Sequence, residues 1–113
     1  FSLFSYYQYF IKESKEYLDP TSKNNFHLSF DVDAIDPRFF PATGTPVPEG
    51  LSLNDGRKII EYLRANTNLI SFDLVEINPL LGGKLELDQT YASTIDLLSG
   101  LRIGKSQGIS LQL

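Results

Sequence analysis

Residues 30–37 read FDVDAIDP, and they follow an apolar-leaning stretch over residues 26–30. This pattern predicts a short strand that carries Asp31 to its carboxyl end. Side chains at i and i+2 of a strand point to the same face, so we expect Asp31 and Asp33 to converge on one object. Paired oxygen donors favour a divalent cation such as Mg²⁺, Mn²⁺ or Ca²⁺. The alternative is a strand end whose carboxylates accept backbone N–H groups.

Outward from this stretch, the chain alternates between helical and strand patterns. Apolar periodicity predicts helices over residues 5–18 and 52–65, a second strand over residues 69–75, and a last helix that closes near Gly104. Residues 105–113 show no strong period. Such alternation indicates parallel βαβ units, and therefore an α/β fold.

Capping residues and apolar spacing give each helix an expected start and buried face. Ser5 is expected to cap the first helix, Ser52 with Asp55 the second, and Asp88 or Thr90 the third. Gly56 weakens the second helix by about 1 kcal/mol relative to alanine. The expected buried residues are Tyr6, Tyr7, Phe10, Ile11, Tyr17 and Leu18 in the first helix, Ile59, Ile60 and Leu63 in the second, and Tyr91, Ile95, Leu98 and Leu101 in the third.

A third carboxylate, Glu76, follows the strand predicted over residues 69–75. Ligands of open α/β sheets bind beyond the carboxyl ends of the strands, where Asp31, Asp33 and Glu76 are all expected. A carboxylate between apolar neighbours is costly to bury unless it meets a cation or hydrogen-bond donors. A planar guanidinium is one suitable partner, because it binds a carboxylate bidentately. A structural salt bridge with a nearby arginine is the alternative.

Residues 36–50 contain four of the six prolines and are expected to form a long, ordered loop. Loops of this length in compact domains are usually functional. Asp36 precedes Pro37, and we interpret it as a turn former and not as a ligand. His27 lies four residues before Asp31, and we interpret it as a structural histidine.

Composition limits the classes of function. A length of 113 residues suits one domain. The net charge of −4 argues against nucleic acid or an anionic membrane as a partner. The absence of cysteine excludes disulfides and thiolate metal sites, and no apolar run approaches the ~20 residues that span a bilayer. The chain has no methionine, even at position 1, so we expect an internal or C-terminal piece of a longer protein.

Three linked motifs resemble those of the arginase/agmatinase (ureohydrolase) family. Residues 27–37 (HLSFDVDAIDP) and residues 41–47 (PATGTPV) are similar to a metal-binding signature of the family, and residues 72–79 (FDLVEINP) are similar to its glutamate motif. The resemblance runs from about His27 to Leu101. Within the family, Ala42 and residues 78–81 (NPLL) resemble arginases more than agmatinases.

The resemblance implies a three-layer α/β/α fold with a mostly parallel sheet, incomplete in this chain, with residues 1–113 as the C-terminal portion of one ureohydrolase domain. It implies manganese-dependent hydrolysis of L-arginine to L-ornithine and urea, with two Mn²⁺ ions in a complete site. Asp31 would bridge both ions and Asp33 would bind one of them. Glu76 would orient the guanidinium of the substrate, and Thr45 would line the same pocket.

The resemblance also implies what this sequence lacks. The family's other metal ligands lie in Gly-Gly-Asp-His and Asp-Ala-His-x-Asp segments that do not occur here, and His27 does not match its proton-shuttle histidine. We therefore expect no catalytic proton-transfer residue in this chain, and no activity from it alone. Family members commonly form trimers or hexamers, and a cytoplasmic location is expected, with a mitochondrial one as the alternative.

Three other functions remain open from the sequence. The first is an agmatinase or another ureohydrolase. The second is a dehalogenase-type phosphatase, which fits less well because Ile35 and Pro37 stand where that motif commonly has other residues. The third is a non-catalytic fragment.

Overall fold

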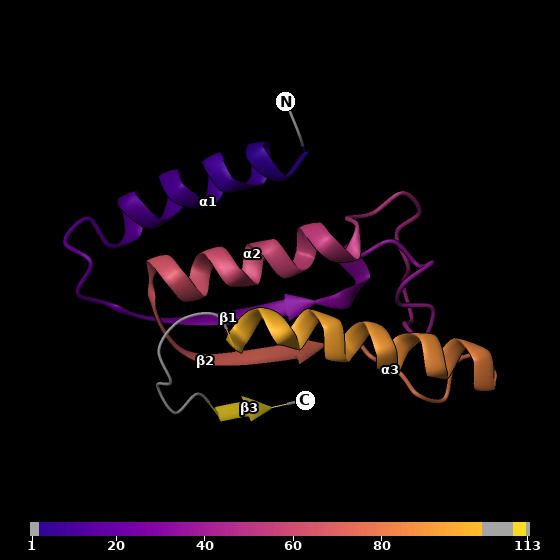
Figure 1. Cartoon of the computed structure of the whole chain (residues 1–113). Helices are drawn as coiled ribbons and strands as arrows, with labels where there is room; N and C mark the ends of the chain where they lie inside the picture. Colours follow the sequence, from indigo (N-terminus) through magenta and orange to yellow (C-terminus); the bar gives the residue numbers. More distant parts are fainter. Residues whose placement is uncertain (1–2, 103–109, 113) are drawn as a thin grey trace.

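The computed structural model describes the backbone of residues 3–102 and 110–112 and the side chains of residues 7–102 (Figure 1). Its elements are α1 (Leu3–Leu18), β1 (Asn25–Asp31), the 3-10 helix η1 (Val32–Ala34), α2 (Leu53–Asn66), β2 (Asn68–Val75), α3 (Lys84–Leu98), the 3-10 helix η2 (Ser99–Arg102) and β3 (Ser110–Gln112). The strands form one parallel sheet in the order β1-β2-β3. The predicted α/β class with a parallel sheet is confirmed. Within this described part of the chain, no helix is long and apolar enough to cross a membrane.

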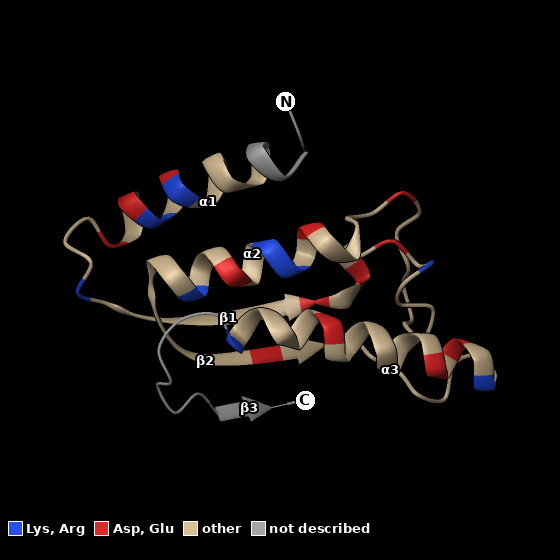
Figure 2. Ribbon diagram, viewed as in Figure 1, with Lys and Arg blue, Asp and Glu red and all other residues tan. Residues whose placement is uncertain are grey.

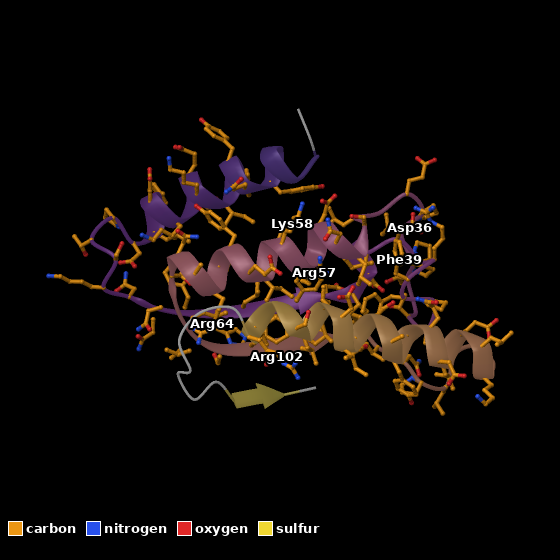
Figure 3. The ribbon with its side chains drawn as sticks, in the orientation of Figure 1. Asp36, Phe39, Arg57, Lys58, Arg64 and Arg102 are labelled. Carbon is orange, nitrogen blue, oxygen red and sulfur yellow. The ribbon has the colours of Figure 1, made fainter. Side chains whose placement is uncertain are left out.

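The helices α2 and α3 pack against each other on one face of the sheet, and α1 lies beside α2 (Figure 1). Right-handed crossovers between strands in the order β1-β2-β3 place the connecting helices on the same face. The core between the layers is a single cluster of buried apolar side chains: Phe30, Val32, Ile35, Phe40, Ile60, Phe72, Leu74 and Leu97. An ion pair of 2.8 Å between Arg57 of α2 and Asp96 of α3 adds to the helix contact (Figure 3). Of the three layers expected, the described residues supply the sheet and one helical layer.

The other face of the sheet carries polar side chains that pair across β1 and β2. The ring of His27 on β1 lies 2.6 Å (Nδ1) from the hydroxyl of Ser71 and 3.1 Å (Nε2) from the carboxylate of Asp73, both on β2. Both ring nitrogens therefore have partners on the neighbouring strand. This arrangement agrees with the structural role expected for His27.

Helix α1 begins at Leu3, before the predicted cap Ser5, so that capping prediction is wrong. Its predicted buried face is also largely wrong, because Phe10, Tyr17 and Leu18 are exposed. Of the predicted face, Tyr7 and Ile11 are half-buried, and the side chain of Tyr6 lies outside the described residues. Among the described elements, α1 packs mainly against α2, so it buries only a narrow stripe there.

Helix α2 begins as predicted, with the hydroxyl of Ser52 accepting the N–H of Asp55 at 3.0 Å. Its most buried positions are Gly56, Ile60 and Arg64, whereas the predicted Ile59 and Leu63 are half-buried. The stripe is shifted because Gly56 faces the core directly. A Cβ at Gly56 would lie 2.6 Å from Ile35 Cδ1, so its hydrogen side chain is what lets α2 approach the core.

We therefore expect Gly56→Ala to destabilise the protein, although alanine is the better helix former by about 1 kcal/mol. Overpacking of this kind costs about 1–3 kcal/mol. Urea unfolding measures the effect as a lower transition midpoint at unchanged slope. Gly44→Ala is the control, since a Cβ there meets nothing within 4 Å. Equal or greater stability of Gly56→Ala would contradict this packing.

Helix α3 begins at Lys84, earlier than Asp88 or Thr90, so the predicted start is wrong. Glu86 caps it by reaching back, and its carboxylate accepts the N–H of Gly83 at 3.0 Å. The predicted apolar face is correct only in part, because Leu98 and Leu101 pack against the core but Tyr91 and Ile95 are exposed. The fully buried positions of the helix are Thr90, Ser93 and Leu97. The helix ends at Leu98 and continues as η2 to Arg102. The predicted end at Gly104 lies outside the described residues.

Candidate functional site

Asp31 and Asp33 lie together, but not on one strand. Strand β1 ends at Asp31, and Asp33 lies in the 3-10 helix η1. A carboxylate oxygen of Asp31 accepts the N–H of Asp33 at 2.8 Å and so caps that turn. The expectation that they share a strand face is therefore wrong, and a capped turn sets their relation. Figure 2 shows the acidic residues at this carboxyl end of β1.

Asp33 is 9% exposed as a residue, and its carboxylate is held by the proline-rich loop. The hydroxyl of Thr43 donates to its Oδ1, and the hydroxyl of Thr45 donates to its Oδ2. Thr43 is buried, whereas Thr45 is an exposed residue. Hydrogen bonds of this kind orient a carboxylate that would bind a metal. Thr43 was not predicted from the sequence as a site residue, although its position beside Gly44 and Thr45 was a usable signal.

The loop over residues 36–50 is closed at its base, as an ordered loop requires. The N–H of Asp36 donates to the carbonyl of Leu51, and the N–H of Leu51 donates to the carbonyl of Ala34, each at 2.8 Å. Gly50 permits this approach, because a Cβ there would lie 2.7 Å from the Ala34 carbonyl oxygen. The loop therefore returns to a fixed point beside η1 and keeps its threonines near Asp33.

Asp36 forms the turn that its position before Pro37 predicts. Its carboxylate accepts the N–H and the guanidinium Nε–H of Arg38, both at 2.9 Å (Figure 3 labels Asp36). These hydrogen bonds from the Arg38 side chain and backbone hold the pKa of Asp36 below its ordinary value. Its carboxylate is thus already paired, in agreement with a turn-forming role.

Glu76 lies one strand away from the acidic pair. Asp31 and Val75 are register partners on β1 and β2, and Glu76 follows Val75 directly. Adjacent strands lie about 4.8 Å apart, so the carboxyl ends that bear Asp31 and Glu76 adjoin. The expectation that these carboxylates share one edge of the sheet is therefore supported by the register.

The backbone of Glu76 has φ of +71°, in the left-handed region that residues other than glycine rarely adopt. The side chain is exposed, and none of the ion pairs among side chains 7–102 involves it. The alternative of a structural salt bridge thus has no partner among those residues. Glu76 lines a cleft of about 500 Å³ together with Leu74, Val75, Ile77, Pro79, Tyr91 and Thr94.

Ala42 connects the proline-rich loop with the rest of the site. Its carbonyl accepts the N–H of Asn78, in the loop after Glu76, at 2.9 Å. Its N–H donates to the hydroxyl of Thr90 on α3 at 3.1 Å. Both Ala42 and Thr90 are fully buried. The peptide groups of Ala42 are therefore held from two directions. Thr90 was expected only as a possible helix cap, and its contact with Ala42 was not predicted from the sequence.

Carboxylates such as Asp31 and Asp33 match the hard oxygen donors that Mn²⁺ accepts. The described residues nevertheless contain no group of three or more His, Cys, Asp or Glu that could hold a metal ion. The donor chemistry fits manganese, whereas the number of donors does not suffice. A manganese centre that used Asp31 and Asp33 would therefore need further ligands from outside the described residues.

The fold and the site define a class: a parallel α/β protein with carboxylates gathered at the carboxyl ends of adjoining strands. The model of the Arginase family matches residues 6–99. The chain belongs to the arginase family.

Relatives and solved structures agree with this assignment. The chain is 46% identical over 84 residues to Arginase-1 of Mus musculus and 42% identical over 80 residues to an arginase of Schizosaccharomyces pombe. These matches cover 74% and 71% of this chain but 26% and 25% of those proteins. The chain thus spans about a quarter of the curated relatives it matches.

The structural neighbours include arginases and agmatinases. Arginase from Bacillus subtilis matches with a TM-score of 0.68 at 32% identity, covering 86% of this chain and 32% of that one. Arginase from Entamoeba histolytica, solved in complex with L-ornithine, matches with a TM-score of 0.66 at 36% identity, covering 83% and 31%. A hypothetical agmatinase from Burkholderia thailandensis matches with a TM-score of 0.56 at 34% identity, covering 80% and 29%.

Proposed function

We propose that this chain, as one portion of a larger ureohydrolase domain, takes part in the manganese-dependent hydrolysis of L-arginine to L-ornithine and urea. The observation that carries the proposal is the arrangement at the strand ends. Asp33 is held by two threonine hydroxyls beside Asp31, and Glu76 follows on the next strand. A cation site and a guanidinium site thereby adjoin.

In this proposal Asp31 and Asp33 hold part of a centre that is completed by ligands from elsewhere in the protein. When bound, a manganese pair supplies hydroxide near neutral pH and stabilises negative charge that develops during hydrolysis. Asp33 is pre-oriented for this task, because both of its oxygens accept threonine hydroxyls and leave it little freedom to rotate. Asp31 is exposed at the strand end and open to a cation.

Glu76 is proposed to bind the guanidinium of arginine. A carboxylate pairs with a guanidinium through parallel charge-assisted hydrogen bonds, and these would fix the carbon under attack. The left-handed backbone of Glu76 supports a functional role, because such conformations persist where the surrounding structure over-determines them and they cluster at functional sites. Thr45 is proposed to border the same pocket, from its place against Asp33.

Arginine is favoured over agmatine as the substrate. The arginase structures match this chain with TM-scores of 0.68 and 0.66, compared with 0.56 for the agmatinase, and the curated relatives named above are arginases. The Asn78-Pro79-Leu80-Leu81 segment after Glu76 also resembles arginases. Agmatine is the second candidate, since agmatinases share the fold.

The test is a comparison of arginine and agmatine as substrates of the complete Mn²⁺-loaded protein. We expect kcat/KM for arginine to exceed that for agmatine by about 100-fold or more, because a site built for the substrate's α-carboxylate and amine rejects an analogue that lacks a partner group. Urea release measures both reactions. Removal of manganese by a chelator should abolish the activity, and residues 1–113 alone should show none. A higher kcat/KM for agmatine would mean that agmatine, and not arginine, is the substrate. Activity without any metal would refute the proposed mechanism.

A further inference from the structure

We propose that Thr90 is a positioning residue for both halves of the site, acting through the backbone of Ala42. The hydrogen bonds of its side chain and carbonyl go to Ala42 and Thr94, Thr90 is not among the residues lining the cleft at Glu76, and it lies 48 residues from Ala42 in sequence. The proposal rests on the proposed function for its kinetic consequences. The structural part of the proposal does not depend on the proposed function. In that part, the hydroxyl of Thr90 on α3 fixes the loop that holds Asp33.

The first step is the burial of the contact. Thr90 and Ala42 each have 0% relative exposure, and the Thr90 hydroxyl oxygen accepts the Ala42 N–H at 3.1 Å. A backbone N–H in such a place has no access to water. If the Ala42 N–H were left unpaired, its full desolvation cost would oppose folding. The loop therefore strongly prefers the position on α3 in which this hydrogen bond forms.

The second step is the connection from Ala42 to Asp33. The next residue, Thr43, is also buried and donates its hydroxyl to Asp33 Oδ1. Thr45 follows and donates to Oδ2. A shift of the Ala42 peptide therefore moves the donors that orient the proposed metal ligand.

The third step is the connection from Ala42 to Glu76. The carbonyl of Ala42 accepts the N–H of Asn78, two residues after Glu76. The same peptide segment that Thr90 holds thus also ties down the loop that turns at Glu76. Thr90 fixes the distance between the proposed metal-binding and guanidinium-binding carboxylates, and misplacement of reacting groups by about 1 Å can cost about 100-fold in rate.

The experiment compares four variants in the complete Mn²⁺-loaded protein. Thr90→Val keeps the branched shape and removes the acceptor. Thr90→Ser and Thr90→Ala form a second pair that differs only in the hydroxyl, so the proposal stays testable if Thr90→Val does not fold. Thr67→Val is the matched control, because the hydroxyl of Thr67 donates within its own segment, to the carbonyl of Leu63 at the end of α2.

The readouts are hydrogen exchange at the Ala42 amide, Mn²⁺ affinity, and kcat and KM for arginine. In Thr90→Val and Thr90→Ala we expect faster Ala42 exchange, and a loss of about 10- to 100-fold in Mn²⁺ affinity or kcat, the range measured when partners that orient metal ligands are removed. Thr90→Ser should stay within about 3-fold of the wild type, because it retains the acceptor. Thr67→Val should change none of the three readouts.

Two results would overturn the proposal. One is unchanged exchange at Ala42 in the folded Thr90→Val or Thr90→Ala protein, which would mean that the hydroxyl does not hold the loop. The other is accelerated exchange with Mn²⁺ affinity and kcat equal to those of the wild type and of Thr90→Ser. If the wild-type protein does not hydrolyse arginine, the proposed function fails by itself, and Ala42 exchange together with Mn²⁺ affinity still decides the role of Thr90.

Discussion

Glu76→Gln is expected to lower kcat/KM for arginine by about 100-fold or more while leaving the manganese content of the complete protein unchanged. The amide has nearly the shape of the carboxylate but carries no charge, so paired charge-assisted hydrogen bonds to a guanidinium become weak or mismatched. Each such bond is worth about 1.5–3 kcal/mol, and about 1.4 kcal/mol is tenfold in rate. Activity assays and metal analysis of the same preparations measure the two effects separately.

Glu49→Gln is a matched control for this substitution. Glu49 is also exposed and also has a left-handed backbone, with φ of +58°, but it lies in the proline-rich loop and not at the end of a strand. We expect Glu49→Gln to retain wild-type activity. Loss of metal from Glu76→Gln would instead identify Glu76 as a ligand, and equal activity of the two variants would remove its role in substrate binding.

The strands and the long loop could be predicted from the sequence because local signals and tertiary packing agree there. Phe30 of β1 and Phe72 and Leu74 of β2 enter the core, and Leu28 packs against it. The prolines of residues 36–50 restrict the loop, and the pairing of Ile35 with Leu51 closes it. The carboxyl ends of parallel strands meet at one edge of the sheet. For this reason Asp31 and Glu76 could be expected at the same edge.

The helix faces could not be predicted in the same way. On α3 the exposed Tyr91 and Ile95 have the apolar spacing of a buried stripe, yet the buried positions are Thr90, Ser93 and Leu97. Two of these are polar, and they are tolerated because their hydroxyls have hydrogen-bond partners. Apolar periodicity cannot predict a helix face whose buried side chains are hydroxyls with hydrogen-bond partners. On α1 the error has another cause, since among the described elements this helix packs mainly against α2, and packing against one helix buries only part of an apolar surface.

The geometry of the pair formed by Asp31 and Asp33 could not be predicted from the sequence, and the reason is local to this segment. A D-x-D pattern predicts a shared strand face only if the strand continues, and here the first carboxylate ends it by capping a 3-10 turn. The threonines that orient Asp33 lie 10 and 12 residues further on. Their role depends on how the loop returns, and that path is set by contacts with α3 and the Glu76 loop that have no local signature.

Asp33→Asn is the second substitution from which we expect a very large effect. The amide should fit the same seat, since the Thr43 and Thr45 hydroxyls can either donate or accept. What is lost is a negative charge at a proposed metal ligand. Because removal of a partner that only orients a ligand already costs about 10- to 100-fold, we expect Mn²⁺ affinity to fall by about 100-fold or more, and activity to fall with it.

Asp36→Asn is the control variant. It distinguishes the loss of a proposed metal ligand from the loss of a nearby buried carboxylate that is not proposed to bind metal. Asp36 is 5% exposed, close to the 9% of Asp33, and its carboxylate is occupied by Arg38. Asp36→Asn should lower stability, because it weakens the pair with Arg38, and keep wild-type Mn²⁺ affinity. Isothermal titration with Mn²⁺ and thermal unfolding distinguish the two variants. Wild-type Mn²⁺ affinity in a folded Asp33→Asn protein would show that Asp33 anchors the threonine loop and is not a metal ligand. Loss of metal in both variants would show that the effect comes from disruption of the whole turn and not from Asp33 itself.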